Sequence, residues 1–393
     1  MIMKHLKFLL LGYITTIVLL FLYSFTQIDL GLVISRYPFF YELEKAFQQI
    51  GYFNRPLSAV IYIVLLMAMF LFYFAFLFYS RKKEVDKKFV WKTVIISTAI
   101  LAFSYNAFSY DLFNYMFDAK IVTHYQQNPY VQKALDYPQD PMLGFMHWTH
   151  RVYPYGPLWL VMTVPLSFIG LQLFLPTFFL FKLLMGAAFL GSLYFVGKIF
   201  QKIAPERELF GLIFFGLNPL LLNESVVSAQ LDIVMMFFAF WAYFLLLNKK
   251  YVFAFILLLI SIGIKFASGF LLPVFLLVTI MHKKKLSLPV IFGSSLVLLA
   301  ITVVVASLRT NFQPWYLVVP LTLAVFLAHR YFVFIPTMIL SFAALLTYVP
   351  YLYLGNWDKP VPQILMNLYI SAGILSVVAV GGYYTYKIRV KTS

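Results

Sequence analysis

The chain contains no cysteine, and only 11% of its 393 residues are charged. The absence of cysteine excludes structural disulfides and thiolate metal sites. Soluble domains average about 25% charged residues, so this chain cannot form an ordinary water-facing surface. It has instead 63% hydrophobic residues and a mean hydropathy of +0.88. This composition is typical of a polytopic integral membrane protein.

Continuous apolar runs recur along the chain, several of them close to the roughly 20 residues that a helix needs to cross a bilayer. Because these runs do not alternate with polar residues, and because backbone groups in lipid need internal partners, they predict helices. We therefore expect an all-α, polytopic transmembrane helical bundle of about 11–13 hydrophobic segments. The predicted segments are residues 6–23, 57–79, 90–110, 158–170, 173–200, 210–222, 233–247, 251–264, 266–281, 286–308, 315–327, 331–352 and 364–386.

The net charge of +16 comes from basic residues that lie in short connections beside the apolar runs. The positive-inside rule predicts this arrangement for cytoplasmic connections, so we interpret them as topology signals and not as a nucleic-acid surface. The clusters are Lys4/Lys7, 81–88, 198–207, Lys249/Lys250, 283–285 and 387–391. Both termini are then cytoplasmic, provided that segment 158–170 is re-entrant or only partial. Segments 251–264 and 266–281 are expected to form a broken hairpin.

We predict a single membrane domain over residues 1–393. Residues 1–89 would form an N-terminal helical hairpin with a cytoplasmic loop, its first run being a span and not a cleaved signal peptide. The outer loop 27–56 holds an amphipathic segment expected in the membrane interface. Residues 90–393 would form the core, with the external loop 111–157 holding four of the 14 acidic residues and three of the six histidines. Long polar loops on rigid scaffolds commonly carry function, so a site is expected there.

Two carboxylates in this loop, Asp111 and Asp118, are seven residues apart. In a helix this spacing is about two turns, which places both side chains on one face. Asp111 follows a predicted span, where partial burial against aromatic neighbours would suit a general base. The alternative is a solvated residue at the membrane boundary.

Charged residues also lie within or between the apolar runs. Lys182 and Lys265 fall inside them, where a cation is costly and indicates a functional role, unless it reaches the interface by snorkelling. Lys265 would meet a lipid phosphate if the adjacent hairpin breaks there. Asp232 opens a helix, where capping explains a carboxylate as well as a substrate contact does.

Two further groups could line a substrate site. Arg309 beside Trp315 and Tyr316 indicates a platform for a lipid phosphate or a sugar, although an aromatic interfacial belt also explains the pair. His147, His150 and Arg151 could bind an anion or simply mark a solvated loop. No metal-ligand motif, phosphate-binding glycine loop, nucleophile elbow or nucleotide fingerprint is present. An enzyme of this kind would need an activated donor borne by the membrane.

The order of these motifs resembles the GT-C superfamily of membrane glycosyltransferases, and within it the bacterial polyprenyl-phosphate-mannose-dependent α-mannosyltransferases. The matching residues are Tyr110-Asp111, Tyr115, Asn128–Tyr130, Tyr153–Leu158, Asn218–Leu220, Asp232–Met235, Lys265–Gly269 and Gln313–Tyr316. In many members the catalytic Asp follows the first span. Here two spans precede Asp111, so residues 1–89 are interpreted as an appended hairpin.

The resemblance implies a transfer of a hexose, with mannose favoured, from a polyprenyl-phosphate donor to a hydroxyl of a glycan or lipid acceptor. Asp111 would be the base of an inverting single displacement, and Lys265 and Arg309 would hold the phosphate. Asp118, His147, His150 and Arg151 would shape the sugar pocket. No cofactor is expected, and a divalent metal is left open. The resemblance places the protein among the lipids of a bacterial cell membrane, with its active site on the extracytoplasmic face. It leaves the oligomeric state open.

A transporter or lipid flippase is the main alternative. Such a protein would use Lys182, Asp232 and Lys265 as charges at the membrane midplane, within two halves related by a repeat. The sequence shows no such repeat, and its acidic residues gather in one external loop. A structural scaffold would not need Asp111 and Asp118 at one helix mouth. The enzyme is therefore the favoured interpretation.

Overall fold

The computed structural model describes residues 2–281 and 286–392, and 78% of it is helical. Within these residues no β-strand forms, and the extended pairing is limited to one antiparallel bridge between Lys133 and Val152. The all-α class predicted from the continuous apolar runs is confirmed. The basic cluster predicted at 283–285 lies outside the described residues.

Among the described residues, six helices are long and apolar enough to cross a membrane, and a bent pair makes a seventh if it is counted as one span. The long spans are His5–Gln27, Arg55–Arg81, Phe174–Ile203, Leu288–Thr310, Tyr331–Leu354 and Val361–Ile388. They contain α1 (Ile2–Ser24), α3 (Arg55–Arg81), α7 (Phe174–Ile203), α13 (Leu288–Thr310), α15 (Tyr331–Leu346) with α16 (Tyr348–Leu354), and α17 (Val361–Thr392). The shorter helices between them are α4 (Lys87–Leu101), α10 (Asp232–Leu247), α11 (Tyr251–Ile264), α12 (Leu272–Ile280) and α14 (Val318–Ala324). The fold is a polytopic membrane bundle, as expected.

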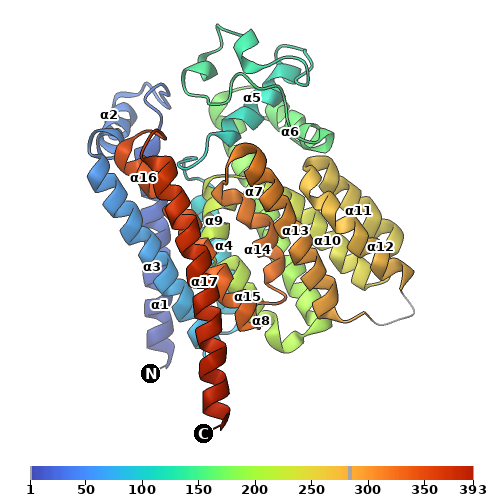
Figure 1. The fold of residues 1–393 in the computed structure, drawn as a ribbon. Helices are drawn as coiled ribbons and strands as arrows, with labels where there is room; N and C mark the ends of the chain where they lie inside the picture. Colours follow the sequence, from blue (N-terminus) through green and yellow to red (C-terminus); the bar gives the residue numbers. More distant parts are fainter. Residues whose placement is uncertain (1, 282–285, 393) are drawn as a thin grey trace.

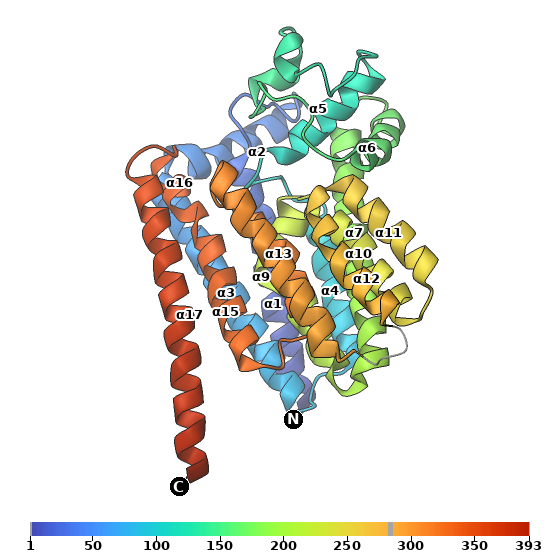
Figure 2. The same cartoon turned by 45° about the vertical axis from the view of Figure 1, so that its right-hand side comes forward.

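The two ends of the bundle differ in character. Both termini lie at one end, and α5 (Asp111–Thr123) and α6 (Pro157–Ile169) lie at the other (Figure 1). The connections that follow α3, α7 and α10, which carry the basic clusters, lie at the end with the termini (Figures 1 and 2). We call this the basic end. The charge pattern therefore separates the two ends as the sequence indicated.

The polar loop 111–157 forms a cap over the end opposite the basic end (Figure 2). It consists of α5, two short turns named η3 (Ala134–Asp136) and η4 (Pro141–Gly144), and the segment leading into α6. Helix α6 has 13 residues, so it is about 20 Å long and falls short of the roughly 30 Å hydrocarbon core. This length agrees with the prediction that segment 158–170 does not cross the membrane in full.

The predicted span 90–110 is too long, because α4 ends at Leu101. Side chains satisfy the backbone groups of the irregular segment that follows: the Ser104 hydroxyl donates to the Leu101 carbonyl (2.6 Å), and the Ser24 hydroxyl accepts the Tyr105 N–H (2.9 Å). Because these polar groups replace helix hydrogen bonds, the chain can turn here and enter α5.

The predicted span 210–222 is bent by 51° between α8 (Glu208–Gly216) and α9 (Pro219–Leu222). Pro219 cannot donate a helix hydrogen bond, and Asn218 caps the new helix by accepting the N–H groups of Leu220 and Leu221 at 2.9 and 3.3 Å. A wider turn, η6 (Asn223–Val227), continues α9. The bend delivers the following residues, 228–232, beneath the cap.

The predicted hairpin over 251–281 forms and is broken where expected. Helix α11 ends at Ile264, Lys265 is extended with φ −147° and ψ 128°, and η7 (Phe266–Leu271) leads into α12. The predicted span 315–327 is instead a short turn, η8 (Pro314–Leu317), followed by α14. The helical segment ends at Ala324 and residues 325–329 form turns, so it is too short to cross a membrane.

Lys182 is fully buried in the middle of the bundle. Its ammonium group donates to the Ser104 hydroxyl (3.1 Å), to the carbonyl of Val227 (2.7 Å) and to the carbonyl of Val226. Backbone oxygens at the end of a helical turn are suitable partners for a buried cation. Lys182 therefore holds η6 in place, which is a structural role.

The amphipathic segment of the outer loop forms α2 (Pro38–Gln48) at the cap end (Figure 1). It buries Glu44 and Gln48 against the protein and exposes Phe39 and Phe40. Glu44 accepts the Ile34 N–H at 3.1 Å. A helix with its aromatic side chains outward fits a position in the membrane interface.

Candidate active site

Asp111 is the first residue of α5, and the preceding turn holds it there. The Ser109 hydroxyl accepts the Asp111 N–H (3.2 Å) and also a hydrogen bond from the Gln230 amide (2.9 Å). The Asn106 side chain donates to the Ser109 carbonyl. The Asp111 carboxylate thus lies at a helix N-terminus, where the macrodipole favours negative charge.

Burial raises the pKa of the Asp111 carboxyl from 3.8 to about 6, although the side chain is partly accessible. The nearby charge of Lys265 and a hydrogen bond from Gln230 oppose this rise, and Arg151 opposes it more weakly. Asp232 adds to it. A carboxylate with a pKa near 6 is still mostly ionised at neutral pH and is a stronger base than an ordinary Asp.

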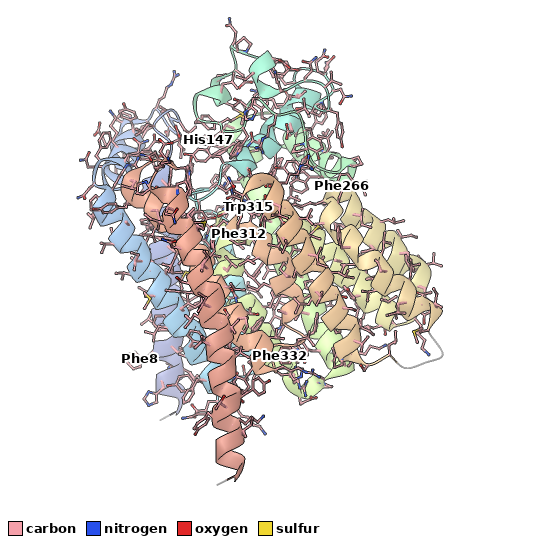
Figure 3. All side chains as sticks on the ribbon, viewed as in Figure 1. Phe8, His147, Phe266, Phe312, Trp315 and Phe332 are labelled. Atoms are coloured by element: carbon pink, nitrogen blue, oxygen red, sulfur yellow. The ribbon has the colours of Figure 1, made fainter. Side chains whose placement is uncertain are left out.

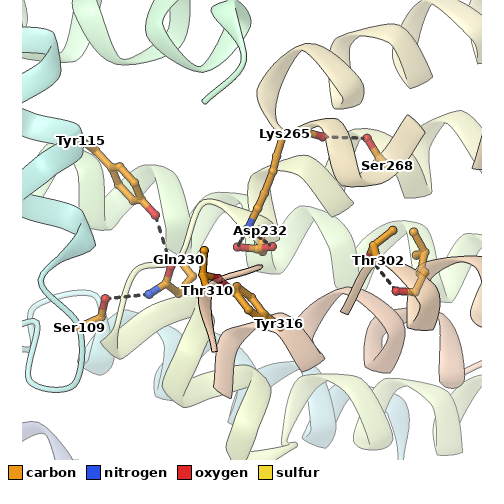
Figure 4. A network of polar contacts seen from close by, with 10 residues as sticks. Ser109, Tyr115, Gln230, Asp232, Lys265, Ser268, Thr302, Thr310 and Tyr316 are labelled. Atoms are coloured by element: carbon orange, nitrogen blue, oxygen red, sulfur yellow. Dashed lines mark hydrogen bonds and ion pairs between the residues drawn. The ribbon is translucent and has the colours of Figure 1, made fainter. Parts of the chain in front are cut away.

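Gln230 links the cap to the bundle. Its amide oxygen accepts the Tyr115 hydroxyl (3.3 Å), while its amide nitrogen donates to Ser109 (2.9 Å), as Figure 4 shows. Tyr115 and Gln230 are each only 1% exposed. The buried Gln230 amide is hydrogen-bonded both to α5 and to the turn before it. These two bonds fix the position of Asp111 relative to the loop before α10.

Asp232 and Lys265 form an ion pair beside this network. The ammonium nitrogen lies 2.8 and 2.9 Å from the two carboxylate oxygens, and the Asp232 side chain is 1% exposed while that of Lys265 is 26% exposed. The Lys265 nitrogen also lies 5.8 Å from the centre of the Tyr316 ring, and the Tyr316 hydroxyl is 2.8 Å from that of Thr310 (Figure 4). The pair therefore leaves Lys265 as a partly exposed cation beside Tyr316.

The Tyr-Pro-Tyr-Gly-Pro turn of the cap contacts the end of α11, next to Lys265. The Gly156 N–H donates to the Ile264 carbonyl (3.0 Å), and a Cβ at Gly156 would lie 2.1 Å from the carbonyl oxygen of Gly263. Only glycine permits this approach. The turn therefore fixes the cap on the segment that carries Lys265.

Asp118 lies on the same face of α5 as Asp111, because Asp111, Asn114, Asp118 and Val122 follow one another at helical spacing and are all partly accessible along a mostly buried helix. Burial raises the pKa of Asp118 from 3.8 to about 8. The negative charge of ionised Asp118 helps to raise the pKa of the Tyr153 and Tyr155 hydroxyls. At neutral pH Asp118 is mostly protonated and can donate a hydrogen bond.

The remaining cap residues lie at different distances from Asp111. The Arg151 guanidinium lies over the Trp148 indole, 4.4 Å from the ring centre, and its charge reaches Asp111. The His147 ring stacks on the Tyr110 ring, with 3.8 Å between their centres, and the negative charge of Asp29 acts to raise the pKa of His147. His147 therefore lies on the side of the cap that faces the N-terminal hairpin. Figure 3 marks His147 in the cap.

Three predicted site residues are not tied to the Asp111 group. The ring of His150 lies 6.5 Å from that of Trp148, centre to centre. Arg309 is exposed at the end of α13 and has no hydrogen bond or ion pair among the described residues. Trp315 contacts Tyr316 at 5.9 Å on the bundle below the cap (Figure 3). The structure thus brings together Asp111, Asp232, Lys265 and Tyr316, with Arg151 acting through its charge.

Sequence reasoning did not single out Ser109, Gln230 or Gly263, although each positions a site residue. The available signal for Gln230 was a polar residue two positions before Asp232, in a connection between apolar runs. For Gly263 it was a glycine two positions before the helix break at Lys265. Both residues act through contacts with the cap, which is distant in the sequence.

Within residues 2–281 and 286–392, no group of three or more His, Asp or Glu side chains is arranged to hold a metal ion. The chemistry available from the side chains present is a base at Asp111, a hydrogen-bond donor at Asp118 and a cation at Lys265. These groups suit a displacement in which an alcohol loses a proton and an anion departs.

Comparison with known proteins identifies the family to which the chain belongs. No curated protein and no solved structure matches the chain. A family model described as "Alpha-(1->6)-mannopyranosyltransferase, N-terminal domain" matches residues 14–281. The match covers more than half of the chain, begins within α1 and includes Asp111, Asp118, Asp232 and Lys265. It confirms the resemblance to membrane mannosyltransferases, favours the enzyme over the transporter, and shows that the chain belongs to the alpha-(1->6)-mannopyranosyltransferase family.

Proposed function

We propose that the protein transfers a mannosyl group from a polyprenyl-phosphate donor to a hydroxyl of a glycan or lipid acceptor, with Asp111 as the general base. The observation that carries this proposal is the placement of a partly accessible carboxylate, with a pKa of about 6, beside the Asp232–Lys265 ion pair. A base and a cation in one site match the two charges that develop in glycosyl transfer from a phosphate.

In the proposed step the acceptor oxygen attacks the anomeric carbon of the sugar, and its proton passes to Asp111. The bond between that carbon and the phosphate oxygen breaks, and its electron pair stays on the phosphate. Lys265 stabilises the departing phosphate, because its side chain is 26% exposed while Asp232 and Tyr316 fix its position. A single displacement of this kind inverts the anomeric centre.

A lipid-linked donor fits the arrangement of the molecule. The site lies where the cap meets the membrane bundle, at the end opposite the basic end. By the positive-inside rule the basic end faces the cytoplasm, so the site is extracytoplasmic, on the outer side of a bacterial cell membrane. A donor anchored in that leaflet reaches the site laterally, and the chain has no nucleotide fingerprint.

The proposed roles need no additional cofactor. A lipid phosphate is already a good leaving group, so it departs without a strong general acid, and Lys265 supplies positive charge to it. Asp118 donates a hydrogen bond in the sugar pocket, with Arg151 at its edge. We propose that Arg309, Trp315, His147 and His150 contact the lipid, the sugar or the acceptor outside this inner group, and that activity persists in EDTA.

The donor class is tested with purified protein in liposomes. Polyprenyl-phosphate-linked mannose in the liposome membrane is compared with nucleotide-linked mannose in solution, each with a mannose-containing acceptor glycan. We expect transfer from the lipid-linked donor, unchanged by EDTA. Transfer from the nucleotide donor alone would contradict the lipid-donor proposal, and loss of transfer in EDTA that returns with a divalent cation would contradict the absence of a cofactor.

A further inference from the structure

A cavity of about 290 Å³ lies at the basic end, far along the bundle from Asp111. It is bounded by the end of α7, the turn η5 (Pro205–Arg207), the start of α13 and the residues that follow α14. Its lining includes Phe200, Arg207, Phe292, Phe326, His329 and Arg330. The proposed sugar transfer uses none of these residues.

The floor of this cavity is apolar. Phe200, Phe292 and Phe326 are between 1% and 4% exposed, and the Phe292 and Phe326 rings stack at 4.2 Å. Leu327, which also lines the cavity, is 6% exposed. Such a floor favours the apolar part of a ligand over water.

The rim is basic and incompletely neutralised. Arg207 pairs with Glu206 (3.3 Å), the acidic residue in the lining, whereas Arg330 has no ion pair among the described residues. Burial and the charges of Arg207 and Arg330 lower the pKa of His329. The rim therefore carries uncompensated positive charge above a hydrocarbon floor, which matches the two parts of an anionic amphiphile.

The position of the cavity fixes which amphiphile can reach it. The first turn of α13 lines it, and Val290 in that turn is 47% exposed and would face lipid in a membrane. By the positive-inside rule this is the depth of the cytoplasmic headgroups. Basic pockets between transmembrane helices on this side are suited to anionic headgroups.

We propose that this cavity binds one anionic phospholipid of the cytoplasmic leaflet, with its phosphate between Arg207 and Arg330 and an acyl chain along Phe292 and Leu327. The lipid would tie η5 to the bases of α13 and α14. Those two helices run to Thr310 and to η8, which bears Tyr316, so the lipid would also fix the spacing of the elements that approach Lys265 from below.

The test uses the full chain in detergent, titrated with phosphatidylglycerol, phosphatidylcholine or inorganic phosphate, with thermal unfolding as the readout. A bound ligand stabilises the folded state, so we expect phosphatidylglycerol to raise the melting temperature by at least about 2 °C more than phosphatidylcholine does. Equal shifts with the two lipids would overturn the proposal. So would a shift of the same size with inorganic phosphate, because that result would identify the ligand as a free anion.

Variants locate the effect. In R207Q/R330Q the concentration of phosphatidylglycerol at half effect should rise about 30-fold, because two arginines near a headgroup are lost. Lys250→Gln, which removes a charge from the same end but not from the cavity, should match the wild type. A rise of the same size in both variants would overturn the proposed location.

A second variant leaves the charges in place. Leu327→Trp fills the floor, so it should abolish the preference for phosphatidylglycerol, and a preserved preference would contradict the acyl-chain placement. Should either variant fail to fold, native mass spectrometry of the wild type still decides. We expect one retained phosphatidylglycerol from an equal mixture with phosphatidylcholine, and unselective retention would refute the proposal.

Discussion

The ammonium group of Lys265 lies 2.8 and 2.9 Å from the two carboxylate oxygens of Asp232, at the point where the hairpin of α11 and α12 is broken. Lys265 is extended there, and Asp232 is the first residue of α10. Two breaks between helices that are distant in the sequence therefore meet as an ion pair. The buried carboxylate fixes the lysine, whose own side chain stays 26% exposed.

Removing the lysine should impair both stability and transfer. Lys265→Met leaves the buried Asp232 carboxylate without its partner, which costs about 3 kcal/mol for pairs of this kind and less here because Lys265 is 26% exposed. We expect a lower melting temperature and a loss of transfer. The double variant K265M/D232N should recover most of the stability but not the activity. Recovery of transfer in the double variant would show that Lys265 only neutralises Asp232.

The pH dependence of transfer should report Asp111. Because its pKa is about 6, kcat/KM should rise with pH through about 6 and level off above 7, and at pH 5 it should be about tenfold below the plateau. Arg151→Gln removes a charge that lowers this pKa, so the rising limb should move to higher pH, whereas Lys250→Gln should leave it in place. If the rising limb of the pH profile in R151Q stays where it is in the wild type, the influence of Arg151 on the pKa of Asp111 is contradicted.

Asp118 should behave as a neutral acid. Its folded-state pKa of about 8 lies above its usual value of 3.8, so its contribution to stability is present at low pH and is lost as pH rises toward and through 8. Asp118→Asn mimics the protonated group. We expect this variant to keep most of its transfer activity at pH 7 and to lose less stability than the wild type between pH 6 and 9, measured by thermal unfolding. An identical decline in both proteins would refute the raised pKa.

The contact of the cap with α11 can be tested at one glycine. Gly156→Ala places a Cβ 2.1 Å from the Gly263 carbonyl oxygen, so the turn must move away from Lys265. We expect a loss of about 1–3 kcal/mol in stability and at least a tenfold loss of kcat. Gly144→Ala, in the same cap, meets nothing closer than 3.7 Å and should be neutral. Equal behaviour of the two variants would show that this contact does not position the site.

The sequence was informative where one property decides the structure. Hydropathy located the long spans, basic residues separated the two ends, and the spacing of Asp111 and Asp118 placed them on one helical face. The predicted span boundaries were wrong where polar side chains replace helix hydrogen bonds, as at Ser104 after α4 and Asn218 before α9. Apolar residues continue across these breaks, so hydropathy alone cannot detect them.

The site was only partly predictable for a related reason. Asp111, Asp232 and Lys265 could be selected singly, because each is a charge at the edge of an apolar run. Their meeting depends on Gln230 and on the contact of Gly156 with Gly263, which are tertiary relationships between segments more than 100 residues apart. Arg309 was selected by the same criterion, but it lies outside the group because α13 ends with its last turn exposed.

The most direct test of the account is a comparison of Asp111→Asn with Asp118→Asn in mannosyl transfer from polyprenyl-phosphate-linked mannose, after both variants are shown to be folded and to bind the donor. Removal of the base should cost D111N at least about 100-fold in kcat, as is typical of general-base catalysis, while D118N stays within a few-fold of the wild type. Transfer by D111N at the wild-type rate would contradict the assignment of Asp111 as the base.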